Sequence, residues 1–145
     1  MTEQNEISDY DLKRRREEGL ELLLDYGKGG GLIPVVVQDY QTKEVLMLGY
    51  INRDAFETTL QTTTLQTYRA AFWSRSRGKS WIKGEEESGN FLNVVEIKVD
   101  CDQDAIVYLV EKEKGGACHT KDNGDYRNSC FYRKLNPETG NLEFV

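Results

Sequence analysis

Residues 91–104 read FLNVVEIKVDCDQD, and this stretch decides the expected fold because it joins a strand pattern to a cluster of acidic side chains. In its first part, Phe91–Val99, the side chains at odd positions form one set and those at even positions, such as Leu92 and Val94, form another. That periodicity predicts a β-strand, because successive side chains of a strand point to opposite faces. Aspartates then alternate with Cys101 and Gln103, so an extended chain would place the carboxylates on one side and these two side chains on the other.

Short apolar segments elsewhere in the chain indicate that the core consists mainly of strands. Leu32–Asp39 is rich in valine, and Val45–Ile51 follows it after a polar turn, so these two segments predict a hairpin. Further strands are expected at Tyr68–Ser76, Ala105–Val110 and Cys130–Leu135, with loops at 77–90 and Gly115–Ser129.

Two helices are expected beside these strands. The first helix is expected at residues 8–26, because Ser8 and Asp11 form a capping pattern at its start and a glycine-rich segment at 27–31 follows its end. Its leucines can share much of one face: Leu12, Leu20, Leu23 and Leu24. Asn52 is expected to cap a short helix that runs to about Leu60. The chain is therefore divided into an N-terminal helical extension, residues 1–30, and a single domain, residues 31–145.

Composition restricts the class of protein. The chain has 145 residues, of which 38% are hydrophobic and 30% charged, so it is neither disordered nor membrane-like. No apolar run approaches the roughly 20 residues of a membrane-spanning helix, and the N-terminus lacks the apolar core of a secretory signal. We therefore expect a cytoplasmic protein without a membrane partner. The net charge of −6 argues against nucleic acid as a partner, because nucleic-acid binding needs a basic face.

The acidic cluster consists of Asp100, Asp102 and Asp104, and three crowded anions favour binding of a cation. Oxygen ligands without sulfur select a hard ion such as Mg²⁺. A calcium loop is a competitor, since Glu111 falls at its twelfth position, but Ala105 stands where that loop needs glycine. A solvated acidic turn without any ion is the other alternative.

The cysteines and the single histidine allow three interpretations. Three cysteines with His119 could form a closed structural zinc site, although Cys118 and His119 are adjacent, and neighbouring residues rarely both reach one ion. Three thiolates with an open fourth position would instead resemble a catalytic zinc that activates water, leaving His119 for acid–base work. Unligated cysteines in the core remain the third alternative, because the spacing has no CxxC element.

Residues 73–84 combine basic, hydroxyl and aromatic side chains. Arginine forks suit phosphate oxygens, and Trp73 or Trp81 could pack on a planar base. The candidate substrate and phosphate ligands are Trp73, Ser74, Arg75, Ser76, Arg77 and Lys83. The alternative is a solvated basic loop whose tryptophans anchor it to the core.

Taken together and in this order, the motifs resemble those of the phosphoribosyl-AMP cyclohydrolase family. The matching blocks include Gly31–Pro34, Trp73–Arg77, Asp100–Asp104, Ala117–Thr120 and Ser129–Arg133, and the resemblance covers about 31–135. It implies a compact, β-rich α+β core of mostly antiparallel strands with a few helices, in an intertwined homodimer. The last three blocks jointly are specific, whereas the basic block alone is not.

The resemblance also implies the roles of the site residues. Cys101, Cys118 and Cys130 would bind Zn²⁺, one ion per subunit, with Cys101 from one subunit and the other two from its partner. Asp100, Asp102 and Asp104 would bind Mg²⁺. The implied reaction is hydrolytic opening of the N1–C6 bond of 1-(5-phosphoribosyl)-AMP by zinc-activated water, with His119 as the proton shuttle, in the third step of histidine synthesis.

Two departures from the family's pattern affect this expectation. Lys121–Asn128 makes the loop before the last cysteine block longer than usual, which leaves the local loop geometry open. The chain ends at Val145, so we expect the form without the pyrophosphohydrolase domain that many relatives carry.

Other classes of protein compete with this interpretation. A zinc deaminase is one, but its His-x-Glu and Pro-Cys-x-x-Cys signature is absent. A zinc-stabilised interaction module and a metal-free binding protein are the others.

Overall fold

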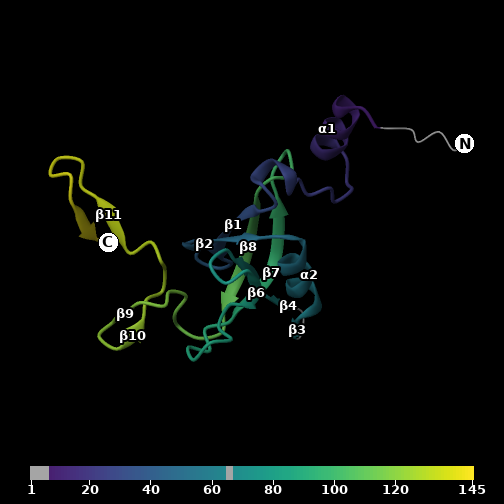
Figure 1. The fold of residues 1–145 in the computed structure, drawn as a ribbon. Helices are drawn as coiled ribbons and strands as arrows, with labels where there is room; N and C mark the ends of the chain where they lie inside the picture. The colour runs from purple at the N-terminus through teal and green to yellow at the C-terminus, as the bar shows by residue number, and fades with distance from the viewer. Residues whose placement is uncertain (1–6, 65–66) are drawn as a thin grey trace, which may run out of the picture.

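A mixed sheet of six strands forms the centre of the structure, a computed structural model that describes residues 7–64 and 67–145. Its strands are β1 (Ile33–Asp39), β2 (Val45–Ile51), β3 (Thr63–Thr64), β4 (Thr67–Arg69), β7 (Leu92–Val99) and β8 (Ile106–Lys112). They lie in the order β2-β1-β8-β7-β4-β3. Strands β1 and β8 are parallel, and the other neighbouring pairs are antiparallel. The predicted α+β fold of mostly antiparallel strands is therefore confirmed (Figure 1).

Three small sheets and the helices complete the fold. The small sheets pair β5 (Ala71–Ser74) with β6 (Lys79–Ile82), β9 (Lys121–Asp122) with β10 (Asp125–Tyr126), and β11 (Arg133–Leu135) with β12 (Leu142–Phe144). The helices are α1 (Asp9–Glu18), the 3₁₀ turn η1 (Gly27–Gly29) and α2 (Arg53–Gln61). Within the described ranges, no helix has the length and apolar character needed to cross a membrane.

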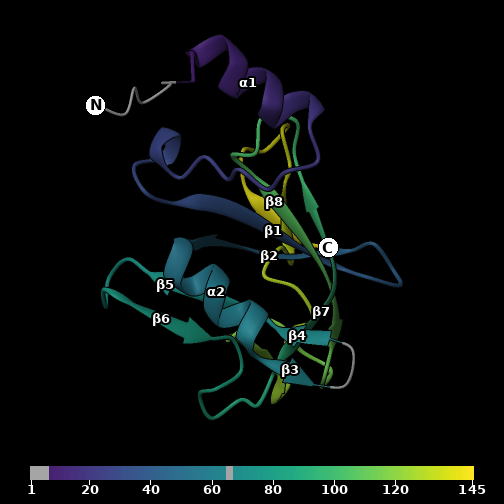
Figure 2. The ribbon, with the colours of Figure 1, turned by 90° about the vertical axis from the view of Figure 1, so that its right-hand side faces the viewer.

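The core lies between the large sheet and α2. Side chains of β1 alternate between buried and half-buried, and Ile33, Val35 and Val37 are fully buried. The side chain of Asn52 caps α2 as predicted, by accepting a hydrogen bond from the backbone N–H of Ala55 at 2.9 Å. Helix α2 packs against β2, β4, β5 and β6 (Figure 2).

The N-terminal helix is shorter than predicted. Ser8 caps it as expected, but α1 ends at Glu18 and not at residue 26. The following residues are not helical, because the backbone N–H groups of Leu23 and Asp25 bond to Gln103 and not to helical carbonyls. The leucines therefore do not share one helical face, and α1 buries no residue. Residues 1–6 of the predicted extension lie outside the described residues.

The predicted strand Tyr68–Ser76 is also wrong, because the chain changes sheets at Ala70. The backbone N–H of Ala70 donates to Leu92 in the large sheet, and its carbonyl accepts from Lys83 beside the small sheet. Ala70 is fully buried and apolar, so no polar residue in the sequence marks the break between the two strands. The segment 77–90, predicted as a loop, contains β6, whose polar residues concealed it.

The C-terminal segment forms a hairpin that stands away from the main sheet (Figure 1). Its first strand begins at Arg133, later than the predicted start at Cys130, and the main contacts of β11 and β12 are with each other. Leu135, Leu142 and Phe144 are all more than half exposed. The hairpin therefore has an apolar surface that the described residues of the chain do not cover, and two strands alone are marginally stable in water.

Gly49 in β2 provides a test of the packing beneath α2. A β-carbon at this position would lie 2.5 Å from Cδ1 of Phe72, which is buried. We expect Gly49→Ala to lower the free energy of unfolding by about 1–3 kcal/mol, because the ring must shift in a filled core. Urea unfolding would measure this. Gly115→Ala is the control, since a β-carbon there meets nothing within 4 Å; equal midpoints for the two variants would contradict the packing described.

Candidate functional site

The predicted site residues lie at two opposite ends of strand β8. The turn 100–105 precedes β8, and Cys118 follows it after a short segment. A seven-residue strand spans roughly 20 Å. One chain therefore contains an acidic group at one end of the sheet and a thiol group at the other.

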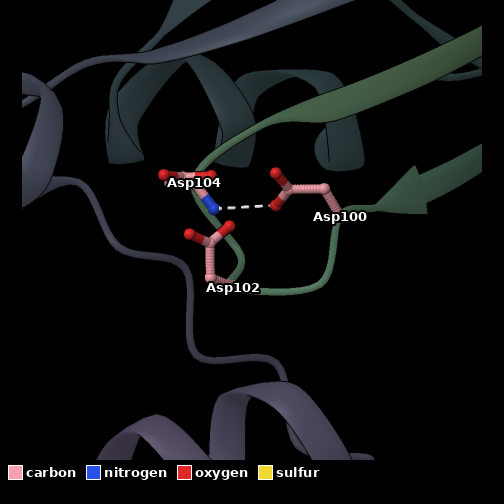
Figure 3. Close-up of side chains that lie close together, drawn as sticks. All are labelled: Asp100, Asp102 and Asp104. Atoms are coloured by element: carbon pink, nitrogen blue, oxygen red, sulfur yellow. Dashed lines mark hydrogen bonds between the residues drawn. The ribbon is translucent and has the colours of Figure 1, made fainter.

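At the first end, the carboxylates of Asp100, Asp102 and Asp104 converge (Figure 3). One oxygen from each lies within 4.8 Å of the others. Across residues 7–64 and 67–145, no other trio of His, Cys, Asp or Glu side chains comes so close together. The donor set is oxygen only and suits a hard cation.

The carboxylates converge because of a turn and not through the alternation of an extended chain that the sequence suggested. The Oδ1 of Asp100 accepts hydrogen bonds from the backbone N–H groups of Asp104 at 3.0 Å and Ala105 at 3.2 Å. Gln103 has a positive φ of 58°, which reverses the chain between the second and third aspartate. A side chain of one residue bonded to the backbone four or five residues later closes the turn.

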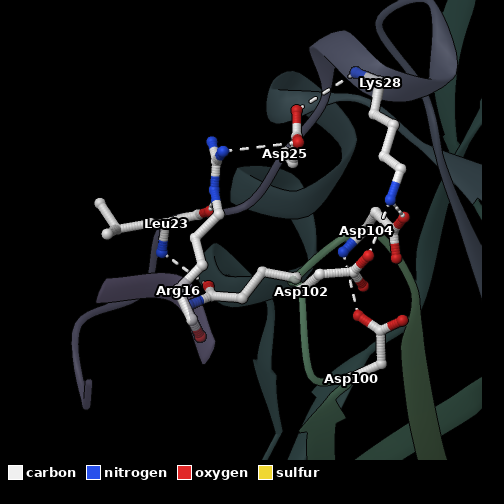
Figure 4. Close-up of polar contacts among 8 residues, drawn as sticks. Arg16, Leu23, Asp25, Lys28, Asp100, Asp102 and Asp104 are labelled. Atoms are coloured by element: carbon white, nitrogen blue, oxygen red, sulfur yellow. Dashed lines mark hydrogen bonds and ion pairs between the residues drawn. The ribbon is translucent and has the colours of Figure 1, made fainter. Parts of the chain in front are cut away.

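The acidic cluster contains a cation from the chain itself. The Nζ of Lys28 lies 2.7 Å from Oδ2 of Asp102 and 2.7 Å from Oδ2 of Asp104 (Figure 4). The hydrogen bond from Lys28 lowers the pKa of Asp102 to about 2. Burial, reinforced by the hydrogen bond with Asp104, raises the pKa of Asp100 above its usual value.

At the second end, a cavity of about 780 Å³ gathers several of the predicted residues. It is lined by Met47, Arg77, Lys79, Ser80, Trp81, Ile82, Lys83, Glu85, Glu86, Ala117, His119 and Cys130. Four of these were predicted as site residues: Arg77, Lys83, His119 and Cys130. Strand β6 thus provides much of the wall, although the sequence showed it as a loop.

Cys118 is buried beside this cavity and its sulfur is hydrogen-bonded. The hydroxyl of Thr120 lies 3.0 Å from Sγ of Cys118, and the backbone N–H of Thr120 donates to it at 3.4 Å. Burial opposes ionisation of the thiol, but these hydrogen bonds outweigh it, so the pKa of Cys118 lies below its usual value. The thiolate of Cys118 is therefore more stable than that of an ordinary buried cysteine.

Cys130 is fixed to the start of β2. Its backbone N–H donates to the carbonyl of Leu46 at 2.7 Å, and the hydroxyl of the buried Ser129 donates to the carbonyl of Val45 at 2.8 Å. Desolvation in the cavity and the neighbouring Cys118 raise the pKa of Cys130 to about 11. A metal ion at this pair must displace the Cys130 proton, since the thiolate is the ligand.

The cavity wall also includes three charged residues that the sequence reasoning did not select, Lys79, Glu85 and Glu86. Glu86 pairs with Lys83, which the sequence did predict as a site residue. The ammonium of Lys83 is almost completely buried and lies 3.7 Å from Glu86. Lys83 also acts on Cys118 and Cys130, where its positive charge favours the thiolates. The sequence feature that could have indicated this part of the wall is Gly84, which lies between Lys83 and Glu85. Its φ is 96°, and a β-carbon there would clash with the backbone of Asn90 and Phe91, so the turn requires glycine.

The remaining predicted substrate ligands do not line the cavity. Trp73 packs against the core, as the alternative interpretation proposed. The guanidinium of Arg75 lies over the ring of Tyr50, 4.6 Å from its centroid. The hydroxyls of Ser74 and Ser76 lie 3.3 Å apart in the turn after β5. Their role in substrate binding stays a prediction.

Cys101 is exposed in the acidic turn and does not join the other two cysteines within one chain. It lies instead beside the N-terminal segment, in a second hollow that it lines with Leu20, Leu22 and Val99. All three cysteines are free thiols.

Comparison with known proteins places the chain in a family. The model of the family described as phosphoribosyl-AMP cyclohydrolase matches residues 47–132. A phosphoribosyl-AMP cyclohydrolase of Archaeoglobus fulgidus is 58% identical over 105 residues, which are 72% of this chain and 86% of that protein. A second, from Chloroherpeton thalassium, is 44% identical over 131 residues, which are 88% of this chain and 85% of that protein. A third, from Nitrosopumilus maritimus, is 50% identical over 112 residues, which are 77% of this chain and 93% of that protein.

These matches, together with the fold and the two groups of polar side chains, define an enzyme of the hydrolase class that acts in histidine biosynthesis. The chain belongs to the phosphoribosyl-AMP cyclohydrolase family. The family resemblance seen in the sequence is thereby confirmed.

The hydrogen bond from Thr120 to Cys118 gives a prediction about pH. The hydroxyl stabilises the thiolate, so we expect Thr120→Val to move the midpoint of Cys118 alkylation by iodoacetamide to higher pH in metal-free protein. Mass spectrometry of the peptide containing Cys118 would follow the rate. Thr120→Ser keeps the hydroxyl and should retain the original midpoint; a midpoint unmoved by Thr120→Val would show that the hydroxyl has no such effect.

Proposed function

We propose that this protein opens the purine ring of 1-(5-phosphoribosyl)-AMP by hydrolysis of the N1–C6 bond, with the cavity beside β6 as the active site. The observation that carries the proposal is that this one cavity contains His119, Cys130 and the cations of Arg77, Lys79 and Lys83. A nucleotide with two phosphate groups needs cations, and a hydrolytic step needs a proton carrier. Membership of the cyclohydrolase family supports the same substrate.

Zinc fits the donor set at this end of the sheet. Cys118 and Cys130 come from two different loops, and their thiols lie close enough to interact: a hydrogen bond from Cys130 lowers the pKa of Cys118, and the charge of Cys118 raises the pKa of Cys130. Soft thiolates select zinc among the common hard and borderline cations. A zinc ion bound there would supply activated water for attack on C6 of the purine.

His119 is the proposed proton carrier. It is exposed on the cavity wall next to Cys118, and no hydrogen bond to another described residue occupies its ring. An imidazole nitrogen would take a proton from the attacking water and return it to N1 as the C6–N1 bond breaks. The oxygen of the water would remain on C6 as a carboxamide carbonyl, and its second proton would pass to the exocyclic nitrogen on C6. The product would be a single ring-opened molecule, because C6 and N1 stay linked through the rest of the base.

Trp81 and Arg77 are proposed to hold the substrate. The Trp81 ring packs on Phe72 with 5.7 Å between centroids, which fixes its orientation, and its other surface lines the cavity. Arg77 lies on the same wall with its guanidinium 5.9 Å from the Trp81 ring. A planar base on Trp81 would therefore bring an attached phosphate to the Arg77 and Lys79 side of the cavity.

Magnesium is proposed for the aspartate cluster, because three carboxylate oxygens within 4.8 Å form a site for a hard cation. In this proposal the cluster contributes to the cavity of a second subunit and not to that of its own chain, since β8 separates the two.

A homodimer is proposed because one chain cannot bring its three cysteines together. In a symmetric pair, Cys101 of one subunit would approach Cys118 and Cys130 of the other. The exposed C-terminal hairpin supports this arrangement. Its first strand begins three residues after Cys130, and the hollow beside Cys101 has the apolar side chains Leu20, Leu22 and Val99.

The activity itself is tested by an ultraviolet assay of ring opening. We expect the purified protein to convert phosphoribosyl-AMP and to lose this activity after treatment with a zinc chelator. Cys118→Ala should lose both zinc and turnover. His119→Ala should keep its zinc and lose roughly 10²-fold or more in kcat, the usual contribution of a general acid–base group. A Cys118→Ala variant with full zinc and full activity would rule out the zinc assignment, and an unchanged kcat would remove His119 from the reaction.

The shared site is tested by mixing two inactive variants. Cys101→Ala and Cys118→Ala, unfolded together and refolded, should regain about a quarter of the wild-type activity, because half the dimers are mixed and each mixed dimer has one complete site. Either variant refolded alone is the control and should stay inactive. A mixture as inactive as its components would contradict sharing of the cysteines between subunits, while leaving the chelator result untouched.

A further inference from the structure

We propose that Lys28 is an internal cation of the aspartate cluster, which a divalent metal ion must displace, so that metal binding releases Lys28 from the acidic turn. The inference rests on the proposed function only in requiring that Asp100, Asp102 and Asp104 bind a divalent cation. It gives a role to the N-terminal segment, which the proposed reaction does not use.

The contacts of Lys28 place its charge where a metal ion would need to bind. Its Nζ is 2.7 Å from one oxygen of Asp102 and 2.7 Å from one oxygen of Asp104. Magnesium binds oxygen at about 2.0–2.1 Å. An ion coordinated by the same two oxygens would lie next to the ammonium, where two positive charges repel each other strongly.

The backbone around Lys28 is positioned for this contact. The backbone N–H of Lys28 donates to Oδ1 of Asp25 at 3.2 Å, and Asp25 also pairs with Arg16 at 3.4 Å (Figure 4). Gly30 closes the 3₁₀ turn η1 with a hydrogen bond to the carbonyl of Gly27. Lys28 therefore projects from a turn with a defined geometry and not from an irregular chain.

Gln103 joins this segment to the acidic turn. Its carbonyl accepts from the backbone N–H of Asp25 at 2.8 Å, and its side-chain oxygen accepts from the N–H of Leu23 at 2.7 Å. Its side-chain N–H₂ donates to the carbonyls of Arg16 at 3.2 Å and Glu21 at 3.1 Å. Gln103 is buried and stands between Asp102 and Asp104. The N-terminal segment that carries Lys28 is thus bound by hydrogen bonds to the acidic turn, whose charge Lys28 partly neutralises.

The balance of charge makes the exchange favourable. The three carboxylates carry three negative charges, and Lys28 neutralises one of them, so the cluster stays anionic and continues to attract a cation of higher charge. The Lys28 side chain is 56% exposed, so it can leave the cluster into water without breaking the Gln103 contacts. Lys28 therefore lowers the affinity for a divalent ion and keeps the turn ordered when the ion is absent.

The first test measures binding of Mn²⁺ to the full-length protein by the electron paramagnetic resonance signal of the free ion. Lys28→Met removes the charge and keeps a side chain of similar length. We expect it to bind Mn²⁺ tighter by on the order of thirtyfold, as expected for removal of a unit charge about 4 Å from a divalent ion in water. Lys28→Arg should bind as the wild type does. Lys13→Met removes the same charge from α1, where Lys13 pairs with Glu17, and should not change the affinity. Equal or weaker binding by Lys28→Met would overturn the proposal.

The second test detects the contact directly. A carbodiimide should join Lys28 to Asp102 or Asp104 in metal-free wild-type protein, and saturating Mg²⁺ should suppress this cross-link, as seen by mass spectrometry. The pair of Lys134 and Glu143 at 3.6 Å in the C-terminal hairpin is the internal control and should react equally in both conditions. A missing Lys28 cross-link without metal, or one that Mg²⁺ leaves unchanged, would overturn the proposal.

Asp104→Asn separates this proposal from the magnesium assignment. If Asp104→Asn weakens Mn²⁺ binding and Lys28→Met has no effect, the metal site stands and the role of Lys28 is refuted. If Asp104→Asn leaves Mn²⁺ binding unchanged, or if the wild type binds no Mn²⁺, the magnesium assignment and the role of Lys28 fail together. Neither result affects the zinc-dependent ring opening.

Discussion

Strand β8 is the constraint on which the rest of the structure depends. It is the central strand that pairs in parallel with β1 and antiparallel with β7, and its Ile106, Tyr108 and Val110 are buried. A strand held on both sides by ladders and on its face by the core can neither bend nor shift register without exposing these side chains. The acidic turn and the thiol-lined cavity are therefore held at opposite ends of the sheet.

The electrostatics differ between the acidic turn and the cavity. At the acidic turn, like charges are crowded, and hydrogen bonds from the turn's backbone together with the ammonium of Lys28 compensate for the repulsion. At the cavity, burial opposes ionisation of the thiols of Cys118 and Cys130, whereas Thr120 and the buried Lys83 favour the thiolates. The donor atoms at the two ends also differ, because the acidic turn offers oxygen and the cavity offers sulfur, and oxygen and sulfur donors select cations of different hardness.

Much of the fold could be predicted from local patterns. The alternation in Phe91–Val99, the hairpin of β1 and β2 and the cap at Asn52 are determined by neighbouring residues, and the structure confirms all three. The predictions failed where distant partners decide the conformation. The helix stops at Glu18 because Gln103, far away in sequence, takes the hydrogen bonds of the next residues, and the strand breaks at Ala70 because two different sheets compete for its backbone.

By itself, the sequence determined which donor groups the chain offers, because a carboxylate, thiol or imidazole keeps its donor atoms in any fold. It also determined the family, since the blocks around Asp100, Cys118 and Cys130 occur together. Only the tertiary structure decided which of these groups share a site. The length of β8 separates Cys101 from the other cysteines, and the turn at Gln103 brings the aspartates and Lys28 together. Those outcomes depend on distances between segments that are remote in the chain, and residue types alone do not contain them.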